Sequence, residues 1–323
     1  MFNIRTDLAV EAREMYKGGH AGEIPGVLVD ESQDDNIKIV KVTILDDDGA
    51  KTMGKPIGDY ITIEAPDLRY RDIELEDKVA QKLADVIKKI SNVNVNMKVL
   101  VIGLGNWNVT PDALGPKAIE NIVVTRHLKE LAPLQFGENI CAVSAMAPGV
   151  LGITGIETAE IVKSVVDKIK PDLVITIDAL ASRRVERLAT TIQVSNTGIS
   201  PGSGIGNKRS AINMESLGVP VIAIGVPTVV DAATIANDAI EHLESALKNN
   251  VESSSPLYNV LKNMNDEDKY ALIKEVLSPE ENLIVTPKEI DLLIKNISSI
   301  LSRGINLALQ PNLTVDEMNQ LVH

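Results

Sequence analysis

The stretch KVLVIGLGN, residues 98–106, decides the fold class of this chain. An unbroken apolar run of this length that ends in glycines is typical of a central parallel strand entering a ligand-facing loop. Similar runs recur downstream: ICAVSA (140–145), DLVITID (172–178), TTIQVS (190–195) and VPVIAIGV (219–226). Helical patterns at residues 116–131 and near 158–169 alternate with the first of them. We therefore predict an α/β fold, with a mostly parallel sheet covered by helices and a phosphorylase/hydrolase-like architecture.

The segments on either side extend this core. Three alternating runs, GVLVDE (26–31), NIKIVKVTIL (36–45) and DYITIEA (59–65), predict a small antiparallel β layer within a subdomain at residues 20–75. A helix is expected at residues 74–90. Residues 249–256 (NNVESSSP) predict a surface connection, and residues 256–323 a helical extension whose longest helix runs from 287 to about 309. All of this fits one domain.

Composition excludes several classes of function. Only 2% of the 323 residues are aromatic, so the core must be built from aliphatic side chains. The formal net charge of −13 opposes binding to nucleic acid. Cys141 is the only cysteine and lies in an apolar run, which predicts a buried thiol and a reducing compartment. No run of about 20 apolar residues is present to span a bilayer, and we expect a cytoplasmic protein without a membrane partner.

Two aspartates are the candidate catalytic residues. Ligands of open α/β sheets bind beyond the carboxyl ends of the strands. Loops rich in Gly, Pro or Asp are predicted there at residues 103–116, 147–155, 178–184 and 225–231. Asp178 ends an apolar run, where burial should raise its pKa, whereas Asp112 follows Thr-Pro in a turn or helix entry that favours the ionised form. Such a pair suits acid–base division of labour: one group activates water and the other protonates a carbonyl oxygen or leaving nitrogen.

Other interpretations stay open at this point. Both aspartates fit ordinary turn and capping roles, and Asp231 is a third carboxylate at the same predicted edge. The pair could share a metal in a maturation peptidase, although carboxylates without histidine bind transition metals poorly. The Gly-rich loops could serve a nucleotide, but GLGNWN has Asn108 where a dinucleotide fingerprint requires glycine. GISPG at 198–202 is no nucleophile elbow, because Pro201 has no N–H for an oxyanion. His127 is expected to be a surface or packing residue rather than a base.

Six blocks of sequence together resemble the germination proteases of spore-forming bacteria. They are RTDLAVEA (5–12), GLGNWNVTPDALGPKA (103–118), APGVLGITGIET (147–158), ITIDALASR (175–183), GISPGSGIGNKR (198–209) and AIGVPTVVDA (223–232). The first block precedes the predicted elements, so we expect it to be exposed and cleavable. The likeness covers nearly the whole chain. The fold of this family is similar to that of hydrogenase maturation endopeptidases.

The resemblance implies an endopeptidase that degrades small acid-soluble spore proteins in the spore core during germination, cutting after Glu in sequences such as Thr-Glu-Ile-Ala. Thr6-Asp7-Leu8-Ala9 is similar to that site. It implies self-cleavage of a zymogen between Asp7 and Leu8, with residues 1–7 as propeptide and 8–323 as the mature domain. It also implies a homotetramer without cofactor or metal, in which Asp112 and Asp178 are the catalytic pair.

An acidic side chain before the cleaved bond needs a cation or backbone donors in its pocket. The loops near the predicted site supply four candidate cations: Arg183, Arg184, Lys208 and Arg209. Any one of them could instead be a solvated surface charge.

Overall fold

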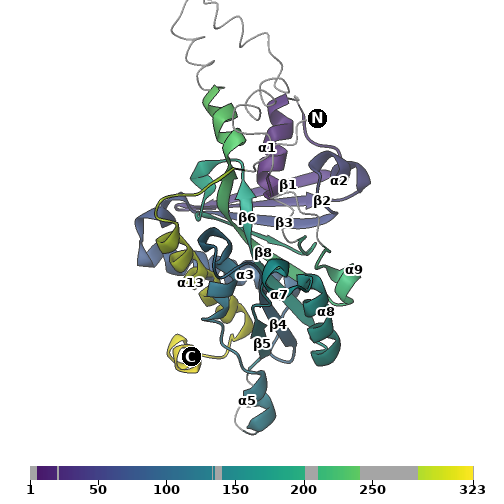
Figure 1. The fold of residues 1–323 in the computed structure, drawn as a ribbon, viewed down its shortest axis with the longest axis vertical. Coiled ribbons are helices and arrows are strands. Elements are labelled where there is room, and N and C mark those ends of the chain that lie inside the picture. Colours follow the sequence, from purple (N-terminus) through teal and green to yellow (C-terminus); the bar gives the residue numbers. More distant parts are fainter. Residues whose placement is uncertain are drawn as a thin grey trace, which may run out of the picture.

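The computed structural model describes residues 6–19, 22–132, 134, 140–200, 210–240 and 283–322. Its described strands form one nine-stranded sheet in the order β1-β2-β3-β7-β8-β6-β4-β5, with β9 paired to β8 (Figure 1). The bounds are β1 Val27–Asp34, β2 Ile37–Ile44, β3 Gly58–Glu64, β4 Lys98–Gly103, β5 Ala142–Met146, β6 Leu173–Ser182, β7 Thr191–Ser195, β8 Val221–Asp231 and β9 Ile284–Val285.

The parallel core is the part predicted from residues 98–106. Strands β5, β4, β6 and β8 are parallel neighbours, which confirms the α/β fold class. The N-terminal strands continue this sheet, because β3 pairs with β7 and β7 pairs with β8, both antiparallel. The residues of the predicted 20–75 subdomain therefore share a ladder of backbone hydrogen bonds with the core. They also place the turn after α2 (Asp47–Met53) beside the cavity that contains the candidate site.

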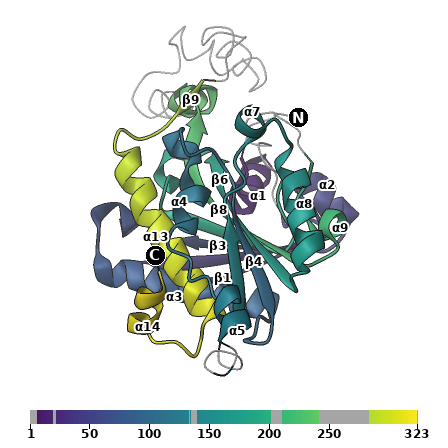
Figure 2. The same cartoon turned by 60° about the horizontal axis from the view of Figure 1, so that its bottom comes forward.

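Successive residues of β4 face opposite layers, as the pleat of a strand requires. Val99 and Val101 pack in the cluster with α3 (Ile73–Ser91) and α13 (Ile290–Leu309). Leu100 and Ile102 pack in another cluster with α8 (Thr158–Ile169) and α9 (Met214–Leu217). Figure 2 shows these helix pairs on opposite sides of the sheet. Each large aliphatic side chain buried in this way stabilises the fold by about 1.5–3 kcal/mol.

Two of the long helices have bounds close to those predicted. Helix α3 begins after Asp72, whose carboxylate accepts from the N–H groups of Glu74 and Leu75 as a helix cap. Helix α13 begins at Ile290, three residues later than expected. It can lie close to α3 because Gly304 has no side chain; a Cβ at this position would be 2.9 Å from Ala80 O. The buried faces of both helices close one side of the sheet.

The helix predicted at residues 116–131 is wrong as a single element. The chain forms α4 (Leu114–Ile119) and, after a break, α5 (Arg126–Leu131). The break has a physical cause, because backbone groups there bond to other elements: Val123 N–H donates to Asn306 Oδ1, and Thr125 N–H to Val143 O. These tertiary bonds replace the helical ones.

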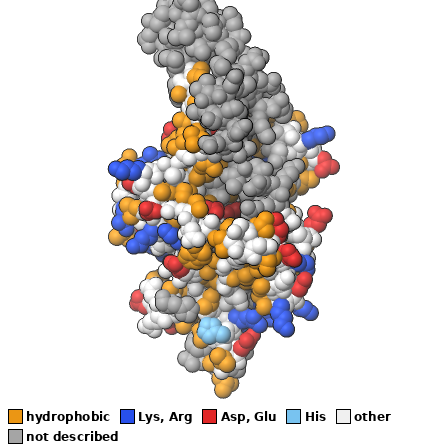
Figure 3. Space-filling view, in the orientation of Figure 1, with side chains coloured by type: hydrophobic (Ala, Val, Ile, Leu, Met, Phe, Trp, Pro, Cys, Tyr) orange, Lys and Arg blue, Asp and Glu red, His pale blue; other side chains and the backbone are white. Residues whose placement is uncertain are grey.

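The remaining described elements are short, apart from α1, which packs against β2 and β3. They are α1 Ala9–Gly19, α2 Asp47–Met53, α7 Leu151–Thr154, α14 Val315–Leu321, the 3-10 turns η1 Pro66–Tyr70, η2 Thr110–Asp112 and η3 Val185–Arg187, and a helix that begins at residue 232. The predicted connection at 249–256 and the helical patterns from 256 to 282 lie outside the described residues. No helix within the described ranges combines the length and apolarity needed to cross a membrane. On the face seen in Figure 3, basic side chains are interspersed with acidic and hydrophobic ones.

Candidate active site

Strand β4 ends at Gly103, whereas its neighbour β6 and the next strand, β8, continue past this point, and the predicted site lies where β4 ends. The last pair of β4 with β6 joins Gly103 to Ile177, and Asp178 follows directly. The expectation that Asp178 ends its strand is wrong, as is the expected loop at 225–231. Strand β6 runs on to Ser182 because β8 also continues and keeps pairing with it. Asp178 is 7% exposed, and Ala179 N–H donates to its Oδ1 at 2.9 Å.

The loop after β4 folds back and brings Asp112 to the same place. Asp112 is the last residue of η2, and its carbonyl accepts from Asn106 N–H at 3.1 Å. This fold needs glycine at position 105, where φ is +120° and a Cβ would lie 1.9 Å from Asp112 O. Helix α4 follows at once, so the turn and helix-entry context predicted for Asp112 is confirmed. The side chain is partly buried.

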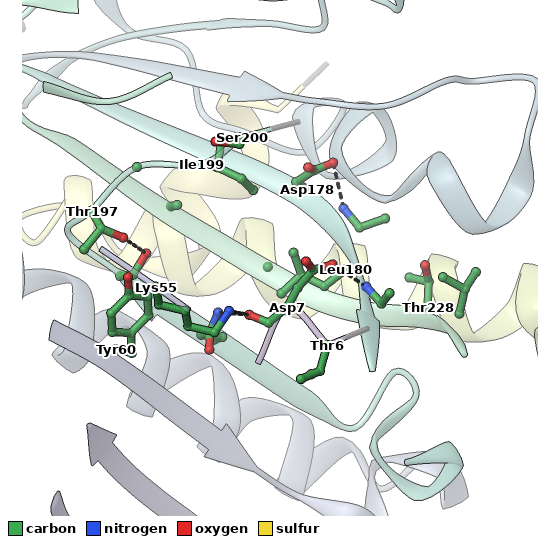
Figure 4. A pocket seen from close by; sticks show the side chains of 18 of the residues that line it. Thr6, Asp7, Lys55, Tyr60, Asp178, Leu180, Thr197, Ile199, Ser200 and Thr228 are labelled. Carbon is green, nitrogen blue, oxygen red and sulfur yellow. Dashed lines mark hydrogen bonds between the residues drawn. The ribbon is translucent and has the colours of Figure 1, made fainter. Parts of the chain in front are cut away.

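Asp112 and Asp178 line one cavity of about 730 Å³. Its wall also includes Asp7, Lys55, Tyr60 and Gln193. Figure 4 shows the Lys55 side chain pointing to Asp7. Asp178 lies on β6, the strand whose Ala181 carbonyl accepts from Asp7 N–H. The structure therefore brings together the two predicted catalytic residues and the first residue of the predicted cleavage site. The lining includes no residue of the 147–155 loop, which the structure describes in full.

The segment at residues 6–12 is docked into the protein, so its predicted exposure is wrong. Leu8 and Ala9 are 0% exposed and belong to a hydrophobic cluster with Tyr60 and Leu180. Asp7 N–H donates to Ala181 O at 2.9 Å, and Ala181 N–H donates to Asp7 Oδ2 at 2.8 Å. Burial of these apolar side chains and the pairing with β6 together hold the segment in place.

Two polar side chains hold the carbonyl oxygen of Asp7, which belongs to the predicted cleaved bond. Lys55 Nζ donates to it at 2.9 Å and Gln193 Nε2 at 3.1 Å. On the other side of the bond, Leu8 N–H donates to Thr6 Oγ1 at 3.1 Å. Sequence reasoning missed Lys55 and Gln193. A weak signal existed for Gln193, a polar residue inside the apolar run TTIQVS, whereas the turn containing Lys55 carried none.

Comparison with known proteins identifies the family to which this site belongs. A sequence model described as germination protease matches residues 6–256 and 244–322. The chain belongs to the germination protease family. Three relatives named germination protease align over 100% of this chain. They come from Caldanaerobacter subterraneus subsp. tengcongensis (67% identical, 99% of the relative covered), Clostridium perfringens strain SM101 (52%, 100% covered) and Bacillus thuringiensis subsp. konkukian (42%, 98% covered).

Membership of the germination protease family gives the protein a peptidase role in germination. A solved NiFe hydrogenase maturation protease, HycI from Thermococcus kodakarensis, is 20% identical to this chain. The match covers 46% of this chain and 80% of that one with a TM-score of 0.30, which is too low to support any conclusion.

Burial governs the charges around the docked segment of this germination protease. It raises the pKa of Asp7 above the ordinary value of 3.8, against the opposing effects of Ala181 N–H and the Lys55 charge; Glu11 raises it further. Burial also lowers the pKa of Lys55, although the carboxylates of Asp7 and Glu11 oppose this shift. Docking thus shifts the Asp7 carboxyl group towards its neutral form, and lower pH favours docking.

An ionic network anchors the same segment through Glu11, which is 1% exposed. Its carboxylate accepts from the backbone N–H groups of Arg183 at 2.6 Å and Arg184 at 3.1 Å, and from Arg187 Nη1 at 3.1 Å. The Arg187 guanidinium also donates to Glu64 and to Glu14. Glu11 therefore ties helix α1 to the end of β6.

The cations predicted for the acidic-residue pocket are not brought to the cavity where the structure describes them. The Arg183 side chain donates to Asp238 at 3.0 Å, and Arg184 Nε lies 3.6 Å from Glu14. Neither residue lines the cavity. Lys208 and Arg209 lie outside the described residues. Among the described residues that line the cavity, the cation is Lys55.

The other singled-out residues have structural positions. Asp231 Oδ1 accepts from the N–H groups of Ala233 at 2.8 Å and Thr234 at 3.4 Å, the pattern of a helix cap. Cys141 is buried, and desolvation raises the pKa of its thiol to about 12. His127 is exposed, which favours the surface position over the packing role. Ser200 lines the cavity but has Pro201 after it, as noted above.

Proposed function

We propose that this germination protease is an aspartate-dependent endopeptidase in which Asp112 and Asp178 form the catalytic dyad. One observation carries the proposal: both carboxylates line the cavity that also holds Asp7 of the predicted cleavage site. The pair holds one proton and directs one water. One carboxylate takes a proton from the attacking water, while the other, protonated, donates to the reacting peptide group.

The proposed substrates are the small acid-soluble spore proteins of the germinating spore, cut after Glu, with a homotetramer in the spore core as the working form. The protein's own Thr6-Asp7-Leu8-Ala9 serves as the first substrate, and the cut between Asp7 and Leu8 removes residues 1–7 as a propeptide. The docked segment supports this, because the backbone N–H of Ala181 donates a hydrogen bond to the Asp7 carboxyl group. Lys208 and Arg209 stay predicted contributors to the pocket that binds the acidic side chain before the cleaved bond.

Incubating the purified chain at mildly acidic pH and sequencing its new N-terminus tests the proposal. Leu8 is the expected first residue, and Asp112→Asn and Asp178→Asn should each abolish its appearance while the circular dichroism spectrum stays unchanged. Processing by either variant would remove the dyad. Loss of wild-type processing after exhaustive chelation would instead support a metal-dependent peptidase.

A further inference from the structure

We propose that Lys55 and Gln193 are catalytic residues that bind the carbonyl oxygen of the cleaved peptide bond and stabilise the negative charge it acquires. The inference rests on the proposed cleavage between Asp7 and Leu8, and extends to substrates that occupy the same place. It assigns two residues to the reaction beyond the aspartate pair.

The contacts of the Asp7 carbonyl oxygen match what such a site needs. Two donors reach it, Lys55 Nζ at 2.9 Å and Gln193 Nε2 at 3.1 Å. When water adds to the carbonyl carbon, this oxygen becomes an oxyanion. Preorganised donors within about 2.7–3.1 Å of the oxyanion lower the barrier because they need no reorganisation during the reaction.

Gln193 also fixes the register of the bound segment. Its Nε2 donates to Asp7 O at 3.1 Å, and its Oε1 accepts from Ala9 N–H at 2.7 Å, so a single amide spans the Asp7–Leu8 bond. The amide orientation follows from the partners, because a carbonyl needs a donor and an N–H needs an acceptor. Gln193 stands on β7, where it pairs with Thr62 of β3 and Gly225 of β8, so two ladders hold its backbone.

Lys55 is placed by a tight turn after α2. Its backbone N–H donates to Ala50 O at 3.2 Å, and Gly54 before it adopts a left-handed conformation with φ +63°. The side chain thus enters the cavity from the antiparallel half of the sheet, whereas Asp178 lies on β6 in the parallel half. Asp7 and Glu11 are the carboxylates that act on its charge.

This arrangement also decides where the dyad proton goes. Since Lys55 and Gln193 already occupy the carbonyl oxygen, the protonated aspartate is left to serve the leaving nitrogen, Leu8 N. Water oxygen bonds to the Asp7 carbonyl carbon and one of its protons passes to the ionised aspartate. The C–N bond then breaks, and the other aspartic acid donates its proton to Leu8 N. The products are a carboxyl group on Asp7 and an amine on Leu8.

The test compares self-processing of the full chain in wild type, Lys55→Met and Gln193→Met, with Lys51→Met and Gln81→Met as exposed controls. Loss of one oxyanion donor should slow the appearance of Leu8 by about 10²–10³-fold, while both controls keep the wild-type rate. The same loss is expected for cleavage of an added peptide containing Thr-Glu-Ile-Ala. Thermal unfolding midpoints check that each variant is folded, and either of the two cavity variants alone carries the test.

Gln193→Glu gives a signature that a purely structural role would not produce. The carboxylate has no donor for Asp7 O, but its protonated form has one, so processing relative to wild type should recover as pH falls. Wild-type rates in Lys55→Met and Gln193→Met, with Asp112→Asn inactive, would overturn this inference and leave the dyad standing. If wild type releases no Leu8, the proposed function fails as well.

Discussion

The parallel core and the docked N-terminal segment are both buried, but different forces hold them. In β4, β6 and β8, apolar side chains are packed from two layers of helices, and the stabilisation is spread over many residues. The segment at residues 6–12 depends on a few hydrogen bonds and ionisable groups, chiefly through Asp7 and Glu11. A core of this kind is rigid and insensitive to pH, whereas a segment held by few polar bonds can be released by changing one of them.

Removing volume from the core should have the largest effect on stability. Ile175 of β6 is 0% exposed. Ile175→Ala leaves a cavity and should lower the free energy of unfolding by about 2–5 kcal/mol. Chemical denaturation measures this. Ile73→Ala, at a position 74% exposed, is the matched control, and an equal loss in both would contradict the contrast drawn here.

Weakening the anchor should have a smaller and local effect. Glu11→Gln keeps the size of the side chain but removes its charge and one acceptor oxygen, so docking should weaken by about 1–3 kcal/mol. Hydrogen exchange should accelerate at the amides of Arg183 and Arg184 and stay unchanged at Ile175. Exposed Glu160→Gln should alter none of these amides. Uniform acceleration across the sheet would mean that segment and core open together.

The pH dependence of docking should trace to Asp7. Its docked pKa is raised by burial, so protonation stabilises the docked state; that stability is full below the undocked pKa, near 3.8, and is lost as pH rises through the raised value. Self-processing should therefore be faster under mildly acidic conditions. Asp7→Asn, which can still accept from Ala181 N–H, should process with a flatter pH profile. An unchanged profile would assign the pH dependence to the dyad instead.

The smallest expected effect is none at all. Because Thr6 and Asp7 line the cavity of their own chain, processing should be first-order, with a half-time independent of protein concentration over a hundredfold dilution. Mass spectrometry of timed samples measures this. A half-time that lengthens on dilution would show that one molecule cleaves another.

The elements that could be predicted from the sequence are those marked by a continuous local pattern of residues. The runs at 98–106 and 172–178 predict β4 and most of β6 because buried parallel strands are apolar throughout. The end of β6 was unpredictable, since it depends on β8 continuing alongside. Asp112 and Asp178 could be proposed as candidates from their context and from the family resemblance. Lys55 and Gln193 could not, because their importance comes from contact with a residue 48 and 186 positions away, which no local pattern encodes.

Glu11, Leu8 and Ala9 all lie on the mature side of the proposed cut. Hydrolysis would release the stretch that ends at Asp7 and vacate the place of its carboxyl group beside Ala181, while the new amino terminus stays held by the Arg187 network and by Gln193. The new N-terminal segment, which begins at Leu8, would therefore stay bound in the place that a later substrate needs for the residues after its cleaved bond. Cleavage of other proteins then requires the start of α1 to dissociate from the site. The new N-terminus of the enzyme therefore competes with substrates for the active site.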